Sequence, residues 1–158
     1  MNLDHRQQKS NFKILNQNGE PLKNQEVEIS QRDHKFLFGC NGFEFVPYAS
    51  DQLDAEAAAD TEKYIARFLD IFNFTTLPFY WGQFEPERGK PRTEELKKAA
   101  QFCQQNNITV KGHPLSWHTL APDWLLDLSN QEIWKAQIKR VKRDLNDFKE
   151  LVDMWDVI

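Results

Sequence analysis

The sequence has few of the residues that build disulfide, metal or phosphate sites. Only two of its 158 residues are cysteine, Cys40 and Cys103, and they lie far apart along the chain. In a chain without an export signal, this favours free, buried thiols over a disulfide. No HExxH or CxxC spacing is present, and Gly39–Gly42 does not open directly onto a helix as a phosphate loop would. We therefore expect no metal ion and no cofactor.

Charge and hydropathy exclude further classes of protein. Acidic and basic residues are mixed along the chain, the net charge is −4, and no basic stripe suggests a nucleic-acid partner. No apolar run is long enough to cross a bilayer, so we expect no membrane partner. Residues 1–20 lack the apolar middle of a signal peptide, which favours a cytoplasmic location. An apolar content of 40% instead predicts a folded domain with a core.

The sequence predicts two regions. Residues 1–35 form a tail that includes a β-hairpin, and residues 36–158 form the main domain. Residues 1–10 are polar and expected to be loose. Short apolar alternations at 12–15 and 26–30 flank a turn signal at Asn18–Pro21, which predicts a β-hairpin over residues 11–34.

The main domain alternates predicted strands and helices. Short apolar runs predict strands, and apolar residues at steps of three and four predict amphipathic helices. The last helix has a capping box at its start, Ser129 with Glu132, and an expected apolar face of Trp134, Ile138, Val141, Leu145 and Phe148. The expected strands are 36–40, 73–77, 108–113 and 151–158. The first expected helix covers 54–72, and Ser129 opens the last one. Between them, Thr93 is expected to cap a helix whose apolar side carries Leu96, Ala99, Ala100 and Cys103.

This order predicts an α/β fold with a parallel sheet and right-handed crossovers. A doubly wound sheet and a barrel both fit it, and the loops separate them. Residues 78–92 and 114–128, which follow the second and third strands, are long and rich in Trp, Tyr, His and Pro. Loops after the strands build the site of a barrel, so the pattern favours part of a (β/α)₈ barrel.

The densest cluster of functional side chains is Gly112-His113-Pro114-Leu115-Ser116-Trp117-His118, at the end of the third strand. A zinc site is a weak interpretation because the two histidines are five residues apart. Two structural histidines in a loop remain an alternative. A sugar site fits better, because neutral imidazole exchanges hydrogen bonds with hydroxyls and indole stacks on a pyranose ring.

Five segments in order resemble glycoside hydrolase family 10 over residues 36–158. Gly112–His118 resembles the family's G-H-x-L-x-W-H, and Trp155–Ile158 resembles its W-D-V-V/I. The other three are Phe36–Gly39 for F-x-F-G, Trp81–Gly89 for W-x-x-x-E-P-x-x-G, and Pro122–Trp124 for P-x-W. The resemblance implies the N-terminal half, strands one to four, of a retaining endo-β-1,4-xylanase barrel.

Such enzymes use two glutamates, an acid/base and a nucleophile. In the family, Asn-Glu directly follows W-D-V-V/I and supplies the acid/base, which is therefore expected just after Ile158, while the nucleophile belongs to strand seven. No catalytic residue is assigned within the chain, and the chain alone is expected to be inactive. Glu85 and Glu87 are interpreted as loop anchors or solvated charges, and Asp156 as a supporting hydrogen-bond partner.

The resemblance implies part of a β-glycan cleft. His113 matches the histidine that contacts the sugar at the cleavage subsite, Trp117 matches the aromatic residue beside it, and His118 matches a histidine that orients a catalytic carboxylate. Trp81 matches the tryptophan after strand two, for which sugar contact and a structural role are both open. Together with Tyr80 after strand two, these are the expected substrate-binding residues.

The sequence departs from the family where the glycone sugar binds. The family's E-N-x-x-K-W supplies Glu, Asn and Lys, where this chain has Thr76, Leu77 and Tyr80, and Leu120 replaces a common Gln. Fewer polar groups bind xylose hydroxyls less well. An intact parent protein is therefore expected to cleave a β-glycan or small β-glycoside, with a modified glycone as one option.

Four strands leave two open sheet edges, so the isolated chain is expected to be marginally stable, oligomeric or prone to aggregate. Two other functions fit the sequence. The first is a non-catalytic carbohydrate-binding half barrel with an intact aromatic platform. The second is a structural half barrel that pairs with itself.

Overall fold

The computed structural model describes residues 4, 7, 9–32 and 34–158. The chain divides into two units, Met1–His34 and Lys35–Ile158. Among the described residues of the first unit, one antiparallel bridge joins Leu15 to Pro21. It closes a tight turn in which the Asn16 side chain accepts hydrogen bonds from the backbone N–H groups of Asn18 and Glu20.

The predicted hairpin is therefore wrong in its register and extent. Leu22 pairs with Ile14 by a backbone hydrogen bond, and residues 26–30 form no strand. The apolar side chains of both runs remain exposed, as for Phe12 and Ile29. An isolated two-stranded hairpin is marginal without an apolar layer to cover, which explains why the alternation alone does not produce one.

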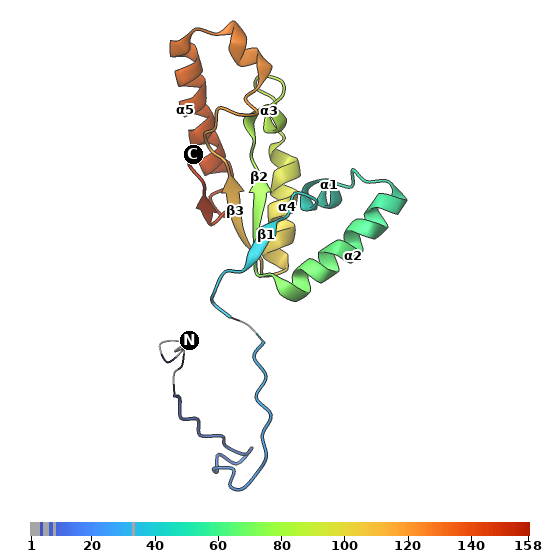
Figure 1. Ribbon diagram of the computed structural model, residues 1–158, viewed down its shortest axis with the longest axis vertical. Helices are drawn as coiled ribbons and strands as arrows, with labels where there is room; N and C mark the ends of the chain where they lie inside the picture. Colours follow the sequence, from blue (N-terminus) through green and yellow to red (C-terminus); the bar gives the residue numbers. More distant parts are fainter. Residues whose placement is uncertain (1–3, 5–6, 8, 33) are drawn as a thin grey trace. The chain divides into compact units, whose positions relative to one another are not determined.

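The second unit is a four-stranded parallel sheet in the order β1-β2-β3-β4, visible in Figure 1. Its strands are β1 (Gly39–Asn41), β2 (Phe74–Pro78), β3 (Thr109–His113) and β4 (Met154–Trp155). Its helices are α1 (Phe45–Ala49), α2 (Ala55–Ile71), α3 (Trp81–Phe84), α4 (Thr93–Gln105) and α5 (Asn130–Asp147), with the 3₁₀ turn η2 (Asp123–Asp127). None of the described helices is long and apolar enough to cross a membrane.

The helix ends follow local hydrogen-bonding rules. Asp54 caps α2 by accepting from Ala57 N–H, and Ser129 and Glu132 form both bonds of the predicted capping box on α5. Thr93 is the first residue of α4 rather than its cap, because Arg92 occupies the cap position and makes no side-chain cap bond. The short α1, which contains Pro47, carried no periodic signal in the sequence.

The core lies between the sheet and the helices α1, α2 and α4. Phe45, Phe68 and Leu77 are fully or almost fully buried there. The predicted face of α4, Leu96, Ala99, Ala100 and Cys103, is buried as expected. Side chains alternate across a strand, so burial of Val110 in this core directs Lys111 and His113 to the opposite face of β3.

Two expected apolar surfaces are not buried. The first strand begins at Gly39 rather than Phe36, and Phe36 is 74% exposed. At this sheet edge β1 pairs only with β2, so no second strand covers residues 36–38. On α5, Phe148 at the C-cap is buried, but Trp134 is 67% exposed because the inward side of the helix carries Arg140 and Asp144 instead.

Gly112 brings together two of the segments that resemble the family, Gly112–His118 and Trp155–Ile158. A Cβ atom on Gly112 would lie 2.4 Å from the ring of Trp155, its register partner on β4. The glycine therefore leaves the space that the indole fills, while Trp155 packs against Phe79 and Phe148. This contact fixes β4 beside β3 at the end of the sheet where the long loops begin.

The two cysteines are free, as predicted, but only Cys103 is buried. Burial raises the pKa of the Cys103 thiol to about 12, against a smaller opposing effect of its backbone hydrogen bond. We expect a thiol reagent to modify Cys40 in the native protein and Cys103 only after unfolding. The rise from the ordinary thiol pKa of 9.0 to about 12 lowers the thiolate fraction of Cys103 at neutral pH by about a thousandfold and slows its labelling accordingly.

Mass spectrometry after timed labelling at neutral pH measures both rates, and the Cys40→Ser variant isolates the slow site. Equal labelling of both thiols in the native protein would contradict the packing of α4 against the sheet.

Candidate functional site

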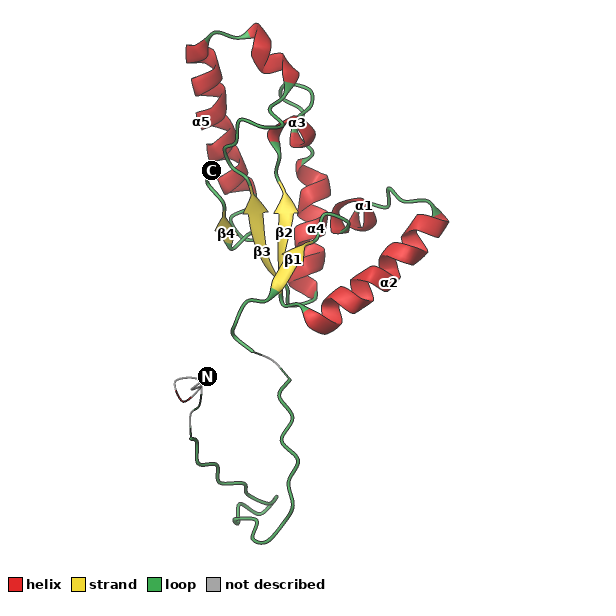
Figure 2. Cartoon of the chain, in the orientation of Figure 1, coloured by secondary structure: helices red, strands yellow, loops and turns green. Residues whose placement is uncertain are grey.

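Three predicted side chains meet at the carboxyl ends of β2 and β3. The ring centroids of Tyr80 and His113 are 5.4 Å apart, those of Tyr80 and Trp117 are 5.8 Å apart, and those of His113 and Trp117 are 6.2 Å apart. We call these three rings the mouth cluster. Tyr80 directly follows β2, His113 ends β3, and Trp117 lies in the loop after β3. In Figure 2 the arrowheads of both strands point toward these loops.

A carboxylate and an ammonium group hold His113 in place. Asp156, directly after β4, has one carboxylate oxygen 2.9 Å from His113 Nδ1 and 2.8 Å from Lys111 Nζ. The hydrogen bond from Lys111 lowers the pKa of Asp156; burial opposes this shift, and His113 adds to it. Asp156 is therefore ionised at neutral pH and acts as an acceptor for both neighbours.

This pairing fixes the tautomer of His113. A carboxylate only accepts hydrogen bonds, so Nδ1 of the ring donates and carries a proton. In neutral imidazole Nε2 is then an acceptor. Among the described residues, Nε2 has no hydrogen-bond partner. The geometry thus presents one acceptor beside two aromatic rings, an arrangement suited to a sugar hydroxyl and the apolar face of its ring.

His118 and Phe43 lie at the margins of the mouth cluster. His118 is exposed, and its ring centroid is 6.2 Å from that of Trp117. Phe43, which follows β1, meets Tyr80 edge to face with centroids 6.1 Å apart. Trp117 is 40% exposed, so its ring is accessible for stacking. Phe43 had no signal in the sequence because a single aromatic residue after a short strand resembles ordinary core packing.

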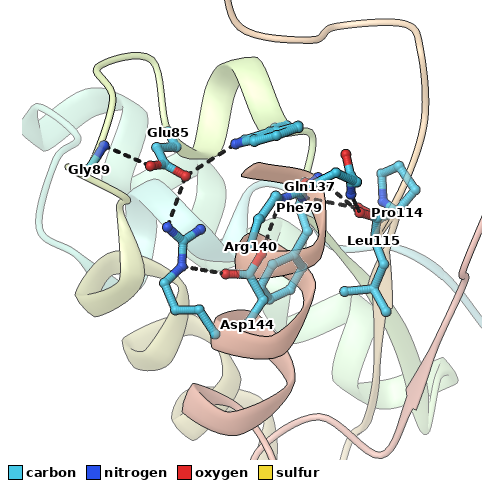
Figure 3. A network of polar contacts seen from close by, with 10 residues as sticks. Phe79, Glu85, Gly89, Pro114, Leu115, Gln137, Arg140 and Asp144 are labelled. Atoms are coloured by element: carbon cyan, nitrogen blue, oxygen red, sulfur yellow. Dashed lines mark hydrogen bonds and ion pairs between the residues drawn. The ribbon is translucent and has the colours of Figure 1, made fainter. Parts of the chain in front are cut away.

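Trp81 does not join the mouth cluster, which corrects the prediction that it contacts the sugar. It is 4% exposed, and its indole N–H donates to the Glu85 carboxylate over 3.1 Å. The other oxygen of Glu85 accepts from Gly89 N–H at 2.8 Å, and Arg143 Nη1 lies 2.9 Å from the first (Figure 3). Glu85 is therefore a buried anchor of the loop after β2, as interpreted from the sequence.

Arg140 on α5 ties together the two loops that carry the mouth cluster. Its guanidinium donates to the carbonyl oxygens of Phe79, Pro114 and Leu115, and its Nε donates to Asp144 over 3.1 Å (Figure 3). Phe79 precedes Tyr80, and Pro114 follows His113. Arg140 thus positions the backbone on both sides of the mouth cluster.

Asp144 balances the charge beneath this contact. It is fully buried and accepts from Arg140 and from Arg143 Nε at 2.8 Å. Burial raises the pKa of Asp144, and the bonds from Arg143 and Arg140 counteract that rise. Burial likewise lowers the pKa of Arg140, against the attraction of Asp144. These opposed effects show that each charge depends on its partner to remain buried.

Sequence reasoning did not identify Lys111, Arg140 or Asp144 as supports of the site. For Arg140 and Asp144 the sequence shows the spacing but not the burial. Spaced by four, they lie on one face of α5 between apolar residues, and a charged pair at that spacing is usually read as solvent-exposed. Their burial depends on carbonyl groups from two distant loops, which helix periodicity cannot reveal.

The chemistry open to these residues is binding and positioning. Asp156 has a lowered pKa and shares one oxygen between the Lys111 ammonium group and the His113 N–H, so it is a poor general acid. Both oxygens of Glu85 are occupied beneath a loop. In the part of the chain that the structure describes, no group of three or more His, Cys, Asp and Glu side chains could hold a metal ion.

The positions that depart from the expected glycone pattern lie in different surroundings. Leu77 is fully buried in the core on the helix side of β2, so its side chain does not line the mouth. Thr76 pairs in register with Lys111, which places the two side chains on the same face of the sheet. Leu120 is exposed and has a positive φ of 57°, and its carbonyl accepts from Gly82 N–H over 2.7 Å.

Comparisons with known proteins agree with this geometry. The profile of glycosyl hydrolase family 10 matches residues 44–158. Endo-1,4-beta-xylanase B of Thermotoga neapolitana is 32% identical over 103 residues, covering 63% of this chain and 30% of that protein. An endo-1,4-beta-xylanase 5-like protein of Arabidopsis thaliana is 23% identical over 156 residues, covering 97% of this chain and 26% of that protein. The chain thus spans less than a third of these two curated relatives.

The solved structures show which fold the four strands belong to. Xylanase 10B from Thermotoga petrophila, crystallised with xylobiose, superposes with a TM-score of 0.59 and 27% identity, covering 76% of this chain and 34% of that one. Xylanase 10B from Thermotoga maritima gives the same score at 26% identity. The parallel sheet and its helices are therefore part of a (β/α)₈ barrel, and the chain belongs to glycosyl hydrolase family 10.

Proposed function

We propose that the protein containing this chain hydrolyses β-glycosidic bonds in a β-glycan, and that the mouth cluster forms one side of its substrate cleft. The observation that carries the proposal is the fixed His113 ring, with Nδ1 bound to Asp156 and Nε2 left as an acceptor beside Trp117 and Tyr80. The xylanase relatives and the xylobiose-bound neighbour support a sugar substrate.

Each side chain has a separate role in this proposal. His113 Nε2 accepts a hydrogen bond from a sugar hydroxyl, and the Trp117 ring stacks on the sugar. Tyr80 closes the side of the cleft nearest β1, and His118 orients a catalytic carboxylate. The two catalytic glutamates come from outside residues 1–158, with the acid/base directly after Ile158. Hydrolysis proceeds with retention through a glycosyl-enzyme intermediate.

The mouth cluster also bears on the substrate. Tyr80 and Phe43 place aromatic surface near His113, where the family pattern supplies polar side chains. A site with fewer hydrogen-bonding groups discriminates less in favour of a fully hydroxylated sugar. We infer that the glycone is a less polar or modified sugar, or that the substrate is a small β-glycoside.

Turnover of xylan and of aryl β-glycosides by the full-length protein tests both statements. We expect hydrolysis of aryl β-glycosides with kcat/KM above that for xylan. A strong preference for xylan would overturn the inference about the substrate but would agree with the proposal that the protein is a glycoside hydrolase. Binding of β-glycan oligosaccharides without turnover of any of them would instead identify a non-catalytic carbohydrate-binding protein.

A further inference from the structure

We propose that a basic groove beside α5 binds the carboxylate of an acidic sugar. The groove has a volume of about 680 Å³ and lies between the loop after β2 and the first half of α5. Arg88 and Trp124 line one part of it, and Lys135 and Lys139 line another. This proposal deepens the function proposed above, because it names a class of substituent on the sugar substrate.

The groove has an excess of positive charge. Five of its lining residues are Arg or Lys, and two are Glu. Both glutamates are already engaged: Glu85 binds Trp81 and Gly89, and Glu132 bonds to Ser129, whose hydrogen bonds lower the pKa of Glu132. Glu132 remains ionised and attracts Arg88 and Lys135, which adds to the lowering of its pKa, but one carboxylate does not offset the three exposed cations of the groove.

Three of the five cations form no close ion pair within the described residues. Arg140 and Arg143 are paired with Asp144 and, for Arg143, with Glu85. Arg88, Lys135 and Lys139 form no ion pair with any Asp or Glu of the described residues, although Glu132 attracts Arg88 and Lys135 at longer range. Free cations around one hollow attract an anion of matching size.

The aromatic wall distinguishes an acidic sugar from a small inorganic anion. The Arg88 guanidinium lies 5.6 Å from the centre of the half-buried Trp124 ring, and the Trp124 indole N–H donates to the Glu85 carbonyl. An indole fixed by its N–H bond, with a guanidinium over its ring, places an aromatic surface beside a bidentate carboxylate donor. The volume also falls in the range of small-molecule sites, well above that of one ion.

The walls of the basic groove come from elements that this chain contains in full. The loop after β2, the η2 turn and α5 supply the residues named above. The two loops concerned also carry Tyr80 and Trp117 of the mouth cluster. Binding in the groove and binding at the mouth can nevertheless be separated, because the groove residues and the mouth residues are different.

Isothermal titration of the full-length protein at low salt tests the proposal. The probes are a xylo-oligosaccharide bearing one glucuronic acid, the same oligosaccharide with its carboxyl group reduced, free glucuronate and inorganic phosphate. We expect the acidic oligosaccharide to bind at least about tenfold more tightly than its reduced counterpart, the effect of one charge-assisted hydrogen bond. Tight binding of free glucuronate would identify the monosaccharide as a sufficient source of the carboxylate.

Variants test which residues cause the preference for the acidic oligosaccharide. Arg88→Gln and the double change Lys135→Gln with Lys139→Gln should each remove the preference for the acidic form. Lys98→Gln with Lys149→Gln removes two exposed charges elsewhere and should leave it unchanged. His113→Ala should weaken both oligosaccharides together and preserve their ratio. Equal affinity of the acidic and reduced forms in the unmodified protein, or equal competition by phosphate, would overturn the proposal whatever happens at the mouth.

Discussion

Replacing Asp144 by alanine is expected to lower the free energy of unfolding by about 3–5 kcal/mol. Asp144 is fully buried and accepts from both Arg140 and Arg143. Its removal leaves the 3% exposed Arg140 with carbonyl partners but no anion, and an unpaired buried charge costs far more than a lost surface pair. Urea denaturation of the full-length protein, followed by tryptophan fluorescence, measures the change.

The matched control is Asp60→Ala on α2. Asp60 pairs with Lys63 at 2.9 Å, but both side chains are largely exposed. Such a pair contributes roughly 0–1 kcal/mol, so the free energy of unfolding of this variant should be close to that of the unmodified protein. If Asp144→Ala were as mild as Asp60→Ala, the Arg140 network would not hold the loops after β2 and β3.

Replacing His113 by alanine is expected to reduce kcat/KM on the best substrate by about a hundredfold. The change removes the sugar hydrogen bond and leaves Asp156 and Lys111 without the ring that they position. A hydroxyl of the bound sugar that is left buried without its partner costs roughly 1–3 kcal/mol, and 1.4 kcal/mol corresponds to a factor of ten. Steady-state kinetics of the full-length protein measure the change.

Two comparisons keep this test specific. Lys98→Ala changes an exposed side chain on α4 and should leave kcat/KM unchanged. Asp156→Asn keeps a group of the same shape but weakens its hold on His113, so its loss should be smaller and dominated by KM. A His113→Ala enzyme that retained activity within a factor of about three would show that the mouth cluster does not contact the reacting sugar.

The order of strands and helices followed from periodicity, because α2, α4 and α5 each show steps of three and four, and α2 and α5 also begin with local side-chain caps. The hydrophobic pattern did not predict the lengths of the two outer strands. Strand β1 and strand β4 are short in the described structure, and the apolar residues around them are partly exposed. An apolar run predicts burial only where neighbouring elements supply the surface to pack against.

The mouth cluster was predictable in part from strand ends. Side chains that directly follow parallel strands converge at one edge, which brought Tyr80, His113 and Trp117 together as expected. Trp81 is one residue beyond Tyr80 but begins α3, and the helical turn rotates its ring into the interior. Sequence spacing could not distinguish those two directions, and it gave no sign that α5 carries the charges beneath the loops.

A crystal structure of the full-length protein with a bound β-1,4-linked oligosaccharide tests the central claim most directly. The account predicts a sugar hydroxyl within hydrogen-bonding distance of His113 Nε2 and a pyranose ring lying on Trp117. A sugar bound away from both side chains, or a His113 ring turned so that Nδ1 leaves Asp156 to meet the sugar, would contradict it.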